Sequence, residues 1–291
     1  MKVALFVPCF IDAFYPEVGI ATLELLERLG MHVDYPLRQT CCGQPMVNSG
    51  AQTDAAGTER IFVDNFRDYD YIVAPSASCI HHVRAHLDAI AQEDDVIRVR
   101  RNAYELTEFL HDVLKVTEFP WARFPHRVGL HISCSAQRHL NSASGSEIGG
   151  PAFSKARTLL EGVADIRFAQ PQRVDECCGF GGTFSVGEEA VSVRMGQEKV
   201  ARHLEAGAEY IVSGDMSCLM HQQGCAERQQ KSIRFLHIAQ ILNGYAGDHF
   251  SSEVDEAVIT PELGITMNTD HRDIGATASE ENRVGVRSKK R

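Results

Sequence analysis

The stretch Glu176-Cys177-Cys178-Gly179-Phe180-Gly181-Gly182-Thr183-Phe184 places two adjacent cysteines at the start of a glycine-rich turn. Such a pair is a poor element of an apolar core, whereas neighbouring thiolates beside a permissive backbone suit a metal centre. An earlier copy reads Thr40-Cys41-Cys42-Gly43-Gln44-Pro45. The motif around which the chain is organised therefore occurs twice.

Each cysteine pair has one single cysteine well upstream and another downstream. The two sets are Cys9, Cys41, Cys42 and Cys79, and then Cys134, Cys177, Cys178 and Cys218. The second copy is longer, mainly because residues 141–151, rich in serine and glycine, insert a loop before its pair. A repeat of this size predicts a duplicated domain whose two halves each present four thiols.

The composition excludes some functions and suggests a compartment. The 291 residues have room for two domains, and 44% hydrophobic with 23% charged residues is ordinary for a globular protein. A net charge of −10 argues against general nucleic-acid binding, which requires a basic surface. No signal-peptide pattern or transmembrane stretch is visible, so we expect a cytoplasmic protein. In that reducing compartment cysteines are better explained as metal ligands or redox thiols than as disulfides.

Apolar strands alternate with amphipathic helices in both halves of the sequence. In the first half, we predict strands at 2–8, 32–36, 71–74 and 96–99, and helices at 17–29, 53–66, from 79 onwards, and at 104–114. In the second half, we predict strands at 127–132, 165–168, 209–213 and 234–236, and helices at 153–161, 187–205 and 237–242. This alternation predicts an α/β fold of two pseudo-repeated domains, each a doubly wound, mainly parallel sheet with helices on both faces.

The domain boundaries follow from the same reading. We expect a first cysteine-rich domain at 1–116, a second at 126–246, and a linker with two prolines at 117–125. Residues 247–291 are rich in acidic side chains and lose the apolar period, so we expect a disordered polar tail.

Four thiolates in one site favour an iron–sulfur cluster or zinc. Structural zinc sites usually combine two C-x₂₋₄-C turns, whereas the only closely spaced cysteines in each set are adjacent. Adjacent side chains diverge, and a cluster with several irons accommodates them more easily than a single ion. Four glycines after the pairs are predicted to let the backbone approach the cluster and donate amides to its sulfides, namely Gly43, Gly179, Gly181 and Gly182.

At this point the sequence resembles a known family. The order of single cysteine, Cys-Cys-Gly and single cysteine, twice in one chain, resembles the duplicated CCG cysteine-rich domain found in heterodisulfide reductase and in the iron–sulfur subunits of glycolate and glycerol-3-phosphate oxidation. Residues 8–12 (Pro-Cys-Phe-Ile-Asp), 177–186 (Cys-Cys-Gly-Phe-Gly-Gly-Thr-Phe-Ser-Val) and 215–220 (Asp-Met-Ser-Cys-Leu-Met) resemble its lactate-utilisation group in particular. The resemblance covers about residues 1–243.

The resemblance implies an oxidoreductase subunit that transfers electrons within a multi-component system oxidising L-lactate to pyruvate. It implies one or two iron–sulfur clusters of the 4Fe–4S type, held by the eight cysteines. Zinc in one half is an alternative that the sequence leaves open. The implied partners are a ferredoxin-like iron–sulfur protein and a third component. Each domain of the wider family ends in C-x-x-C, but here Ser76 and Asp215 stand at the first of those positions. Each half therefore has four thiolates, unless Ser76 or Asp215 supplies oxygen.

Other interpretations remain open beside this one. The chain could serve a related hydroxy-acid oxidase or a heterodisulfide-reductase-like complex, form a zinc-stabilised scaffold, or act as a thiol-disulfide oxidoreductase through Cys41 and Cys42. No catalytic residue is identified, and a nucleophilic pair of His131 and Cys134 rests on proximity in sequence alone. Four further residues are interpreted as structural rather than ligating, namely His81, His82, His221 and Cys225.

Overall fold

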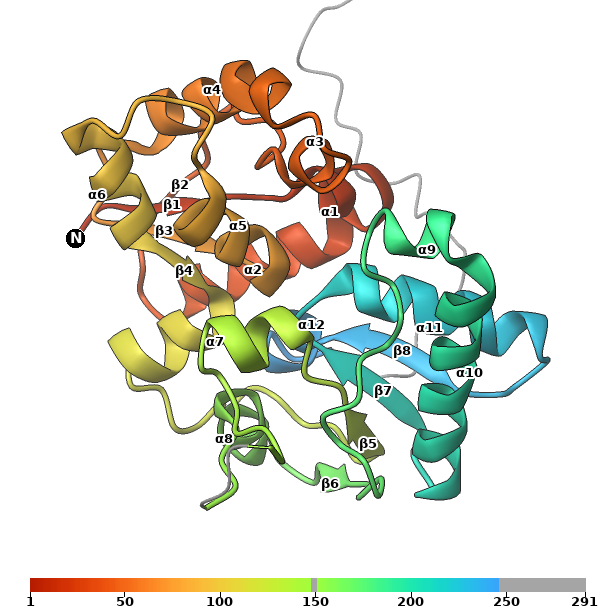
Figure 1. Ribbon diagram of the computed structural model, residues 1–291. Helices are drawn as coiled ribbons and strands as arrows, with labels where there is room; N and C mark the ends of the chain where they lie inside the picture. The colour runs from red at the N-terminus through yellow and green to blue at the C-terminus, as the bar shows by residue number, and fades with distance from the viewer. Residues whose placement is uncertain (148–150, 246–291) are drawn as a thin grey trace, which may run out of the picture. The chain divides into compact units, whose positions relative to one another are not determined.

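The computed structural model describes residues 1–147 and 151–245, which belong to one compact unit. Within these residues the chain forms two four-stranded sheets of the same topology, ordered β2-β1-β3-β4 and β6-β5-β7-β8 (Figure 1). Every pairing of neighbouring strands is parallel. The predicted tail at 247–291 lies outside the described residues. None of the helices in the described part is long and apolar enough to cross a membrane.

The first half contains one sheet and its helices. Its strands are β1 (Val3–Leu5), β2 (Val33–Asp34), β3 (Tyr71–Ala74) and β4 (Ala103–Glu105). Its helices are α1 (Cys9–Phe14), α2 (Pro16–Arg28), α3 (Gln44–Asn48), η1 (Gln52–Ala55), α4 (Ala56–Phe66), α5 (Ala77–His86), α6 (Asp94–Asn102), α7 (Leu106–Glu108) and η2 (Phe109–Val113).

The second half repeats this order. Its strands are β5 (Arg127–Leu130), β6 (Arg167–Phe168), β7 (Tyr210–Ser213) and β8 (Arg234–His237). Its helices are η3 (Ser135–His139), α8 (Lys155–Glu161), α9 (Phe184–Gly187), α10 (Glu189–Glu205), α11 (Met216–Arg228) and α12 (Ile238–Leu242). The predicted α/β fold with two pseudo-repeated, doubly wound sheets is thus confirmed, whereas the domain boundaries stay a prediction.

Apolar side chains pack on both faces of each sheet. On the first sheet, Ala4 and Ile72 contribute to a cluster with α4, α5 and α6. Val3 and Val73, which point to the opposite face, belong to a cluster that also includes buried residues of α2, α7, α8, α12 and the second sheet. This alternation is the period-two pattern of strands covered on both sides. The shared cluster joins the two halves into one unit.

Residues 96–99 were wrongly predicted as a strand. They lie in α6, and the strand comes later, at Ala103–Glu105. Val96 and Val99 are the two buried residues of this helix, so their spacing of three is a helical period that a short apolar run conceals. The predicted helix at 104–114 accordingly begins two residues late, at Leu106, and continues as the π-helix η2.

The turns after β3 and β7 meet where the two halves join. Ser76 and Asp215, at equivalent places in the two copies, form an isolated antiparallel bridge. Nearby, His237 at the start of α12 donates through Nε2 to the carbonyl of Pro75, at 3.2 Å. The carboxyl ends of β3 and β7 therefore face one another, and the contact between their turns positions the two cysteine sets.

Candidate metal centres

The first cysteine quartet gathers at the carboxyl end of the first sheet. Cys9 begins α1 just after β1, and Cys79 lies in the first turn of α5 just after β3. Cys41 and Cys42 arrive from the loop after β2, which places the Sγ atoms of Cys9 and Cys41 3.4 Å apart. Cys42 is buried and hydrogen-bonds with both Cys41 and Cys79. The four thiols, far apart in sequence, thus form one contact group.

The second quartet repeats this arrangement. Cys134 precedes η3 after β5, and Cys218 lies in the first turn of α11 after β7. Cys177 hydrogen-bonds with Cys134, and the buried Cys178 with Cys177 and Cys218. All four predicted residues of each set are therefore brought together, while their role as ligands remains a prediction.

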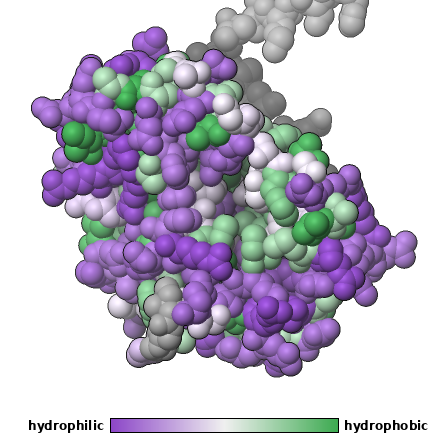
Figure 2. Space-filling view, in the orientation of Figure 1, coloured by the Kyte–Doolittle hydropathy of each residue, from purple (hydrophilic) through white to green (hydrophobic). Residues whose placement is uncertain are grey.

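One cavity of about 600 Å³ is lined by all eight of these cysteines. Apolar side chains, including Phe10, Phe180 and Met216, form much of its wall. Val186 of α9 also lines it and is 84% exposed, so this helix stands at its rim. In Figure 2 the surface is mainly hydrophilic, with paler and green areas where the two halves meet. The two quartets thus share a single, largely apolar space.

Hydrogen bonds among the thiols shift their proton affinities in opposite directions. Donation from Cys42 and Cys9 lowers the pKa of Cys41 to about 2, and donation from Cys134 and Cys178 lowers the pKa of Cys177 to about 2. The hydrogen bond to Cys41, and then desolvation, raises the pKa of Cys9. Each quartet therefore contains one thiol that is readily deprotonated, and the thiolate is the form that binds metal.

The predicted glycines take two different positions. Gly43 and Gly179 have left-handed φ values of 96° and 92°, and their amides donate to the sulfurs of Cys41 and Cys177 at 3.5 and 3.4 Å. Gly181 and Gly182 line the cavity wall instead. The turn after each cysteine pair thus supplies amide donors toward sulfur, as expected from the sequence, although contact with a cofactor stays a prediction.

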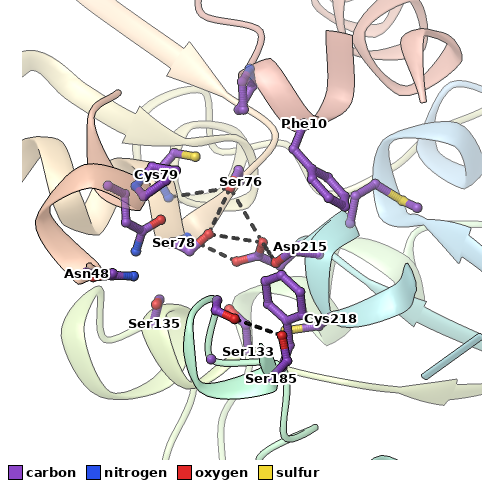
Figure 3. A pocket seen from close by; sticks show the side chains of 18 of the residues that line it. Phe10, Asn48, Ser76, Ser78, Cys79, Ser133, Ser135, Ser185, Asp215 and Cys218 are labelled. Atoms are coloured by element: carbon purple, nitrogen blue, oxygen red, sulfur yellow. Dashed lines mark hydrogen bonds between the residues drawn. The ribbon is translucent and has the colours of Figure 1, made fainter. Parts of the chain in front are cut away.

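Ser76 and Asp215 stand where the wider family has a further cysteine in each domain. Both make hydrogen bonds where the two halves meet. The Asp215 carboxylate is buried and accepts from the Ser78 amide at 3.0 Å, the Ser78 hydroxyl at 3.2 Å and the Ser217 hydroxyl at 3.1 Å. The Ser76 hydroxyl accepts from the Cys79 amide, which caps α5. Figure 3 shows this group between Cys79 and Cys218. Both residues therefore hold the two halves together in the floor of the cavity.

The remaining histidines and Cys225 behave mostly as expected. His221 bonds the carbonyl of Ser192 through Nε2 at 3.1 Å, and Cys225 is buried against α10 with its thiol directed to the carbonyl of Val193. His81 stacks on His139 of the other half, with ring centroids 3.8 Å apart. His82 is buried, and its Nε2 has no hydrogen-bond partner among the described residues.

His131 is the residue that the sequence did not single out as a ligand. It is 0% exposed at the end of β5, and its ligand atom lies within 4.8 Å of the sulfurs of Cys178 and Cys218. Burial holds the pKa of His131 well below its usual value, so the ring is neutral near pH 7. No hydrogen bond joins it to Cys134 in the described part of the chain, which leaves the nucleophilic pair without support. An alignment of the two copies of the repeat could have singled out His131, because it is aligned there with Phe6.

The donor chemistry of both sites fits a metal cluster. Four soft sulfur donors converge in each half, beside amides directed at them, and thiolates of this kind select iron–sulfur clusters, zinc or copper over hard cations. In the second half, the three atoms of His131, Cys178 and Cys218 are close enough to bind one ion. The residues present therefore fit a metal group, and their geometry leaves its type open.

Comparison with known proteins agrees with this arrangement. The CCG cysteine-rich domain matches residues 3–84 and again residues 128–223. A protein named Lactate utilization protein A from Exiguobacterium sp. strain AT1b is 41% identical over 249 residues, which cover 83% of this chain and 97% of the relative. Its namesake from Geobacillus kaustophilus strain HTA426 is 42% identical over 247 residues, covering 84% and 99%.

Similarity to solved structures is weaker. A hypothetical protein from Helicobacter pylori aligns with a TM-score of 0.47 and 9% identity over 83% of this chain and 48% of its own, too distant to bear on function. The sequence relatives and the two domain matches are sufficient by themselves to assign the family. The chain belongs to the Lactate utilization protein A family and carries the CCG cysteine-rich domain twice.

Proposed function

We propose that the protein is an iron–sulfur electron-transfer subunit of a multi-component system that oxidises L-lactate to pyruvate. The observation that carries the proposal is the convergence of two complete thiol quartets on one cavity. The lactate part comes from the name of relatives about 40% identical to this chain. The partners proposed are a ferredoxin-like iron–sulfur protein and a third component.

The chain's own residues would hold and shield the cofactor. Cys9, Cys41, Cys42 and Cys79 would hold one cluster, and Cys134, Cys177, Cys178 and Cys218 the other, each of the 4Fe–4S type. Such clusters supply one-electron exchange at a potential set by hydrogen bonds to sulfur and by solvent exposure. The amides of Gly43 and Gly179 provide such hydrogen bonds, and the apolar cavity wall limits water.

Access to each centre comes from its most exposed ligand. Cys9 and Cys134 are exposed, whereas Cys42, Cys178 and Cys218 are buried. The quartets therefore reach the surface on one side and are anchored in the core on the other. This arrangement supports exchange of electrons with a docked partner.

The metal part is tested by anaerobic purification of the full chain, followed by iron, sulfide and zinc analysis and EPR after reduction. We expect iron and sulfide in equal amounts and visible absorption. Triple replacement of Cys177, Cys178 and Cys218 by Ala should remove the second centre, whereas the matched control Cys225→Ala should keep both. Iron content unchanged by the triple replacement, or zinc without iron in the wild type, would contradict the proposal and favour the scaffold.

The substrate part needs a separate test. In a host that lacks this gene, we expect loss of L-lactate consumption, restored by the wild-type chain and not by the triple variant. Glycolate consumption is measured in parallel, because its loss with lactate use intact would point to a different hydroxy-acid system.

A further inference from the structure

One backbone hydrogen bond of the first half has an equivalent in the second half. The Phe6 amide donates to the carbonyl of Val73 at 2.8 Å, and the His131 amide donates to the carbonyl of Val212 at 2.8 Å. Both acceptors are the third residue of the central strand β3 or β7. His131 therefore takes the position of Phe6 in the duplicated fold.

The helices that cover these two positions follow the same pattern. The buried face of α4 consists of Glu59, Phe62, Val63 and Phe66. The buried residues Gly196, Lys199, Val200 and His203 of α10 have the same spacing. Lys199 thus corresponds to Phe62, and His203 corresponds to Phe66.

An aromatic trio in the first half is consequently a basic trio in the second. Phe6 packs edge-on against Phe62 and Phe66, with ring centroids 4.9 and 5.7 Å apart. The corresponding residues of the second half, His131, Lys199 and His203, carry nitrogen atoms and are each at most 1% exposed. Burying three polar groups where three phenyl rings would serve costs stability unless the polar atoms find partners. The exchange therefore calls for a functional explanation.

The hydrogen bonds of this basic trio are incomplete. Lys199 donates through Nζ to the carbonyls of Val174 and Arg173, at 2.9 and 3.3 Å. Both ring nitrogens of His131, like both of His203, lack a partner among the described residues. Buried polar groups in native proteins are nearly always satisfied, so each of these rings calls for an explanation. His131 has one that His203 does not, because its ligand atom lies within 4.8 Å of the sulfurs of Cys178 and Cys218.

We propose that His131 is a nitrogen ligand of the second metal centre, so that the duplicated fold holds two centres with different ligand sets. The inference rests on the proposed function only in requiring that the second quartet bind metal. At the position of His131 the first half has Phe6, which has no donor atom. The second site thus offers five donors for the four ligand positions of a 4Fe–4S cluster, and His131 would take the place of one thiolate among Cys134, Cys177, Cys178 and Cys218.

The difference in ligands between the two centres affects their reduction potentials in a definite direction. Replacing thiolate by neutral imidazole lowers the negative charge around iron and raises the reduction potential. The buried ammonium of Lys199 behind the loop to Cys177 acts in the same sense, because it favours added negative charge. Electrons would therefore pass from the first centre to the second.

The test uses the anaerobically purified full chain with ¹⁵N-labelled histidine, studied by pulsed EPR after reduction. We expect a histidine nitrogen coupled to the cluster in the wild type. It should be lost in His131→Phe, which installs the first-half residue, and in His131→Cys, which keeps a ligand. The matched control His203→Phe alters the same trio away from the sulfurs and should retain the coupling.

Metal content and potential give independent readouts. His131→Cys is expected to keep the iron of the second centre and lower its reduction equilibrium at least tenfold, which is 59 mV for one electron. His131→Phe is expected to lose part of that iron. If His131→Phe does not fold, His131→Cys alone decides between nitrogen ligation and packing.

The outcomes separate this inference from the proposed function. Iron-containing wild type without histidine coupling, or coupling that persists in His131→Cys, overturns the inference and leaves the proposed function intact. Wild type that holds zinc instead overturns the proposed function. Zinc-edge X-ray absorption then reports whether nitrogen is a ligand and whether His131→Cys removes it, and its absence in the wild type overturns the inference.

Discussion

The Asp215 carboxylate of the second half accepts a hydrogen bond from the Ser78 amide of the first half, at 3.0 Å. Both residues lie in the floor of the shared cavity, and Asp215 is 2% exposed. A single side chain therefore satisfies backbone of the other half between the two cysteine quartets. The integrity of this contact affects both sites.

Asp215→Ala is expected to lower the free energy of unfolding by about 1–3 kcal/mol, because it leaves the half-buried Ser78 amide without its acceptor. Ser217→Ala removes only one hydroxyl donor within the second half and should cost less. Denaturant unfolding of both metal-free variants measures the difference. Equal costs for the two substitutions would show that the contact between halves contributes nothing specific.

His237 makes a second contact between the halves, and its two ring nitrogens make separate hydrogen bonds. Its Nδ1 accepts from the Ala239 amide at 3.1 Å, so Nε2 carries the proton that is donated to the Pro75 carbonyl. Burial lowers the pKa of His237 to about 4, which keeps this neutral form at pH 7.

His237→Ala should therefore cost about 2 kcal/mol, roughly half from the helix cap and half from the contact with Pro75. His237→Asn keeps a capping acceptor but cannot reach Pro75, so it should cost about half as much. Thermal unfolding compares the two variants with the wild type. A loss in the Asn variant as large as in the Ala variant would argue against the cap.

Glu105 is expected to make stability depend on pH. Burial raises the pKa of this carboxyl from 4.5 to about 7 although the Thr107 amide and hydroxyl donate to it. A raised pKa means that the folded state binds the proton more tightly than the unfolded state. The contribution is therefore present below about pH 4.5 and is lost as the pH rises to about 7.

Glu105→Gln removes this titration while keeping an oxygen for the cap of α7. We expect the wild type to lose, relative to this variant, on the order of 3 kcal/mol between pH 4.5 and 7. Unfolding free energies across that range provide the measurement, with the exposed Glu27→Gln as control. Parallel pH profiles of wild type and Glu105→Gln would contradict the expectation.

The cysteine pattern predicted much of the fold because each single cysteine directly follows a strand. Cys9 and Cys79 come after β1 and β3, and parallel strands end at the same edge of a sheet. Local apolar spacing did not distinguish the helix at Val96–Val99 from a strand, since a four-residue run is too short to establish a period. The π-helical form of residues 109–113 likewise leaves no mark in the sequence pattern.

The contacts between halves were beyond prediction from sequence. Ser76 and Asp215 were noticed as departures from the family's cysteine pattern, yet nothing in either copy shows that they meet each other. His131 was considered in the sequence only as a partner of Cys134, three residues later. Its burial beside Cys178 and Cys218, which are distant in sequence, is what makes it a candidate ligand.

The two turn glycines differ in their surroundings and provide a matched pair. Gly43 and Gly179 have nearly equal φ values, but an added Cβ at Gly179 would lie 2.6 Å from the Ser192 carbonyl oxygen. At Gly43 the nearest atom would be Nε2 of His82, at an ordinary 3.5 Å. An alanine at Gly43 therefore adds only left-handed strain, whereas an alanine at Gly179 also forces the backbone apart.

Gly43→Ala should cost about 1–2 kcal/mol and keep the metal of the first quartet. Gly179→Ala should cost more than about 3 kcal/mol, since left-handed strain and a backbone clash add. It should also lower iron in the second quartet, because Ser192 packs behind the turn that carries Cys177 and Cys178. Iron per chain and thermal unfolding of both variants test this. Equal iron loss in both variants would mean that the φ value alone, and not the contact with α10, governs the turn.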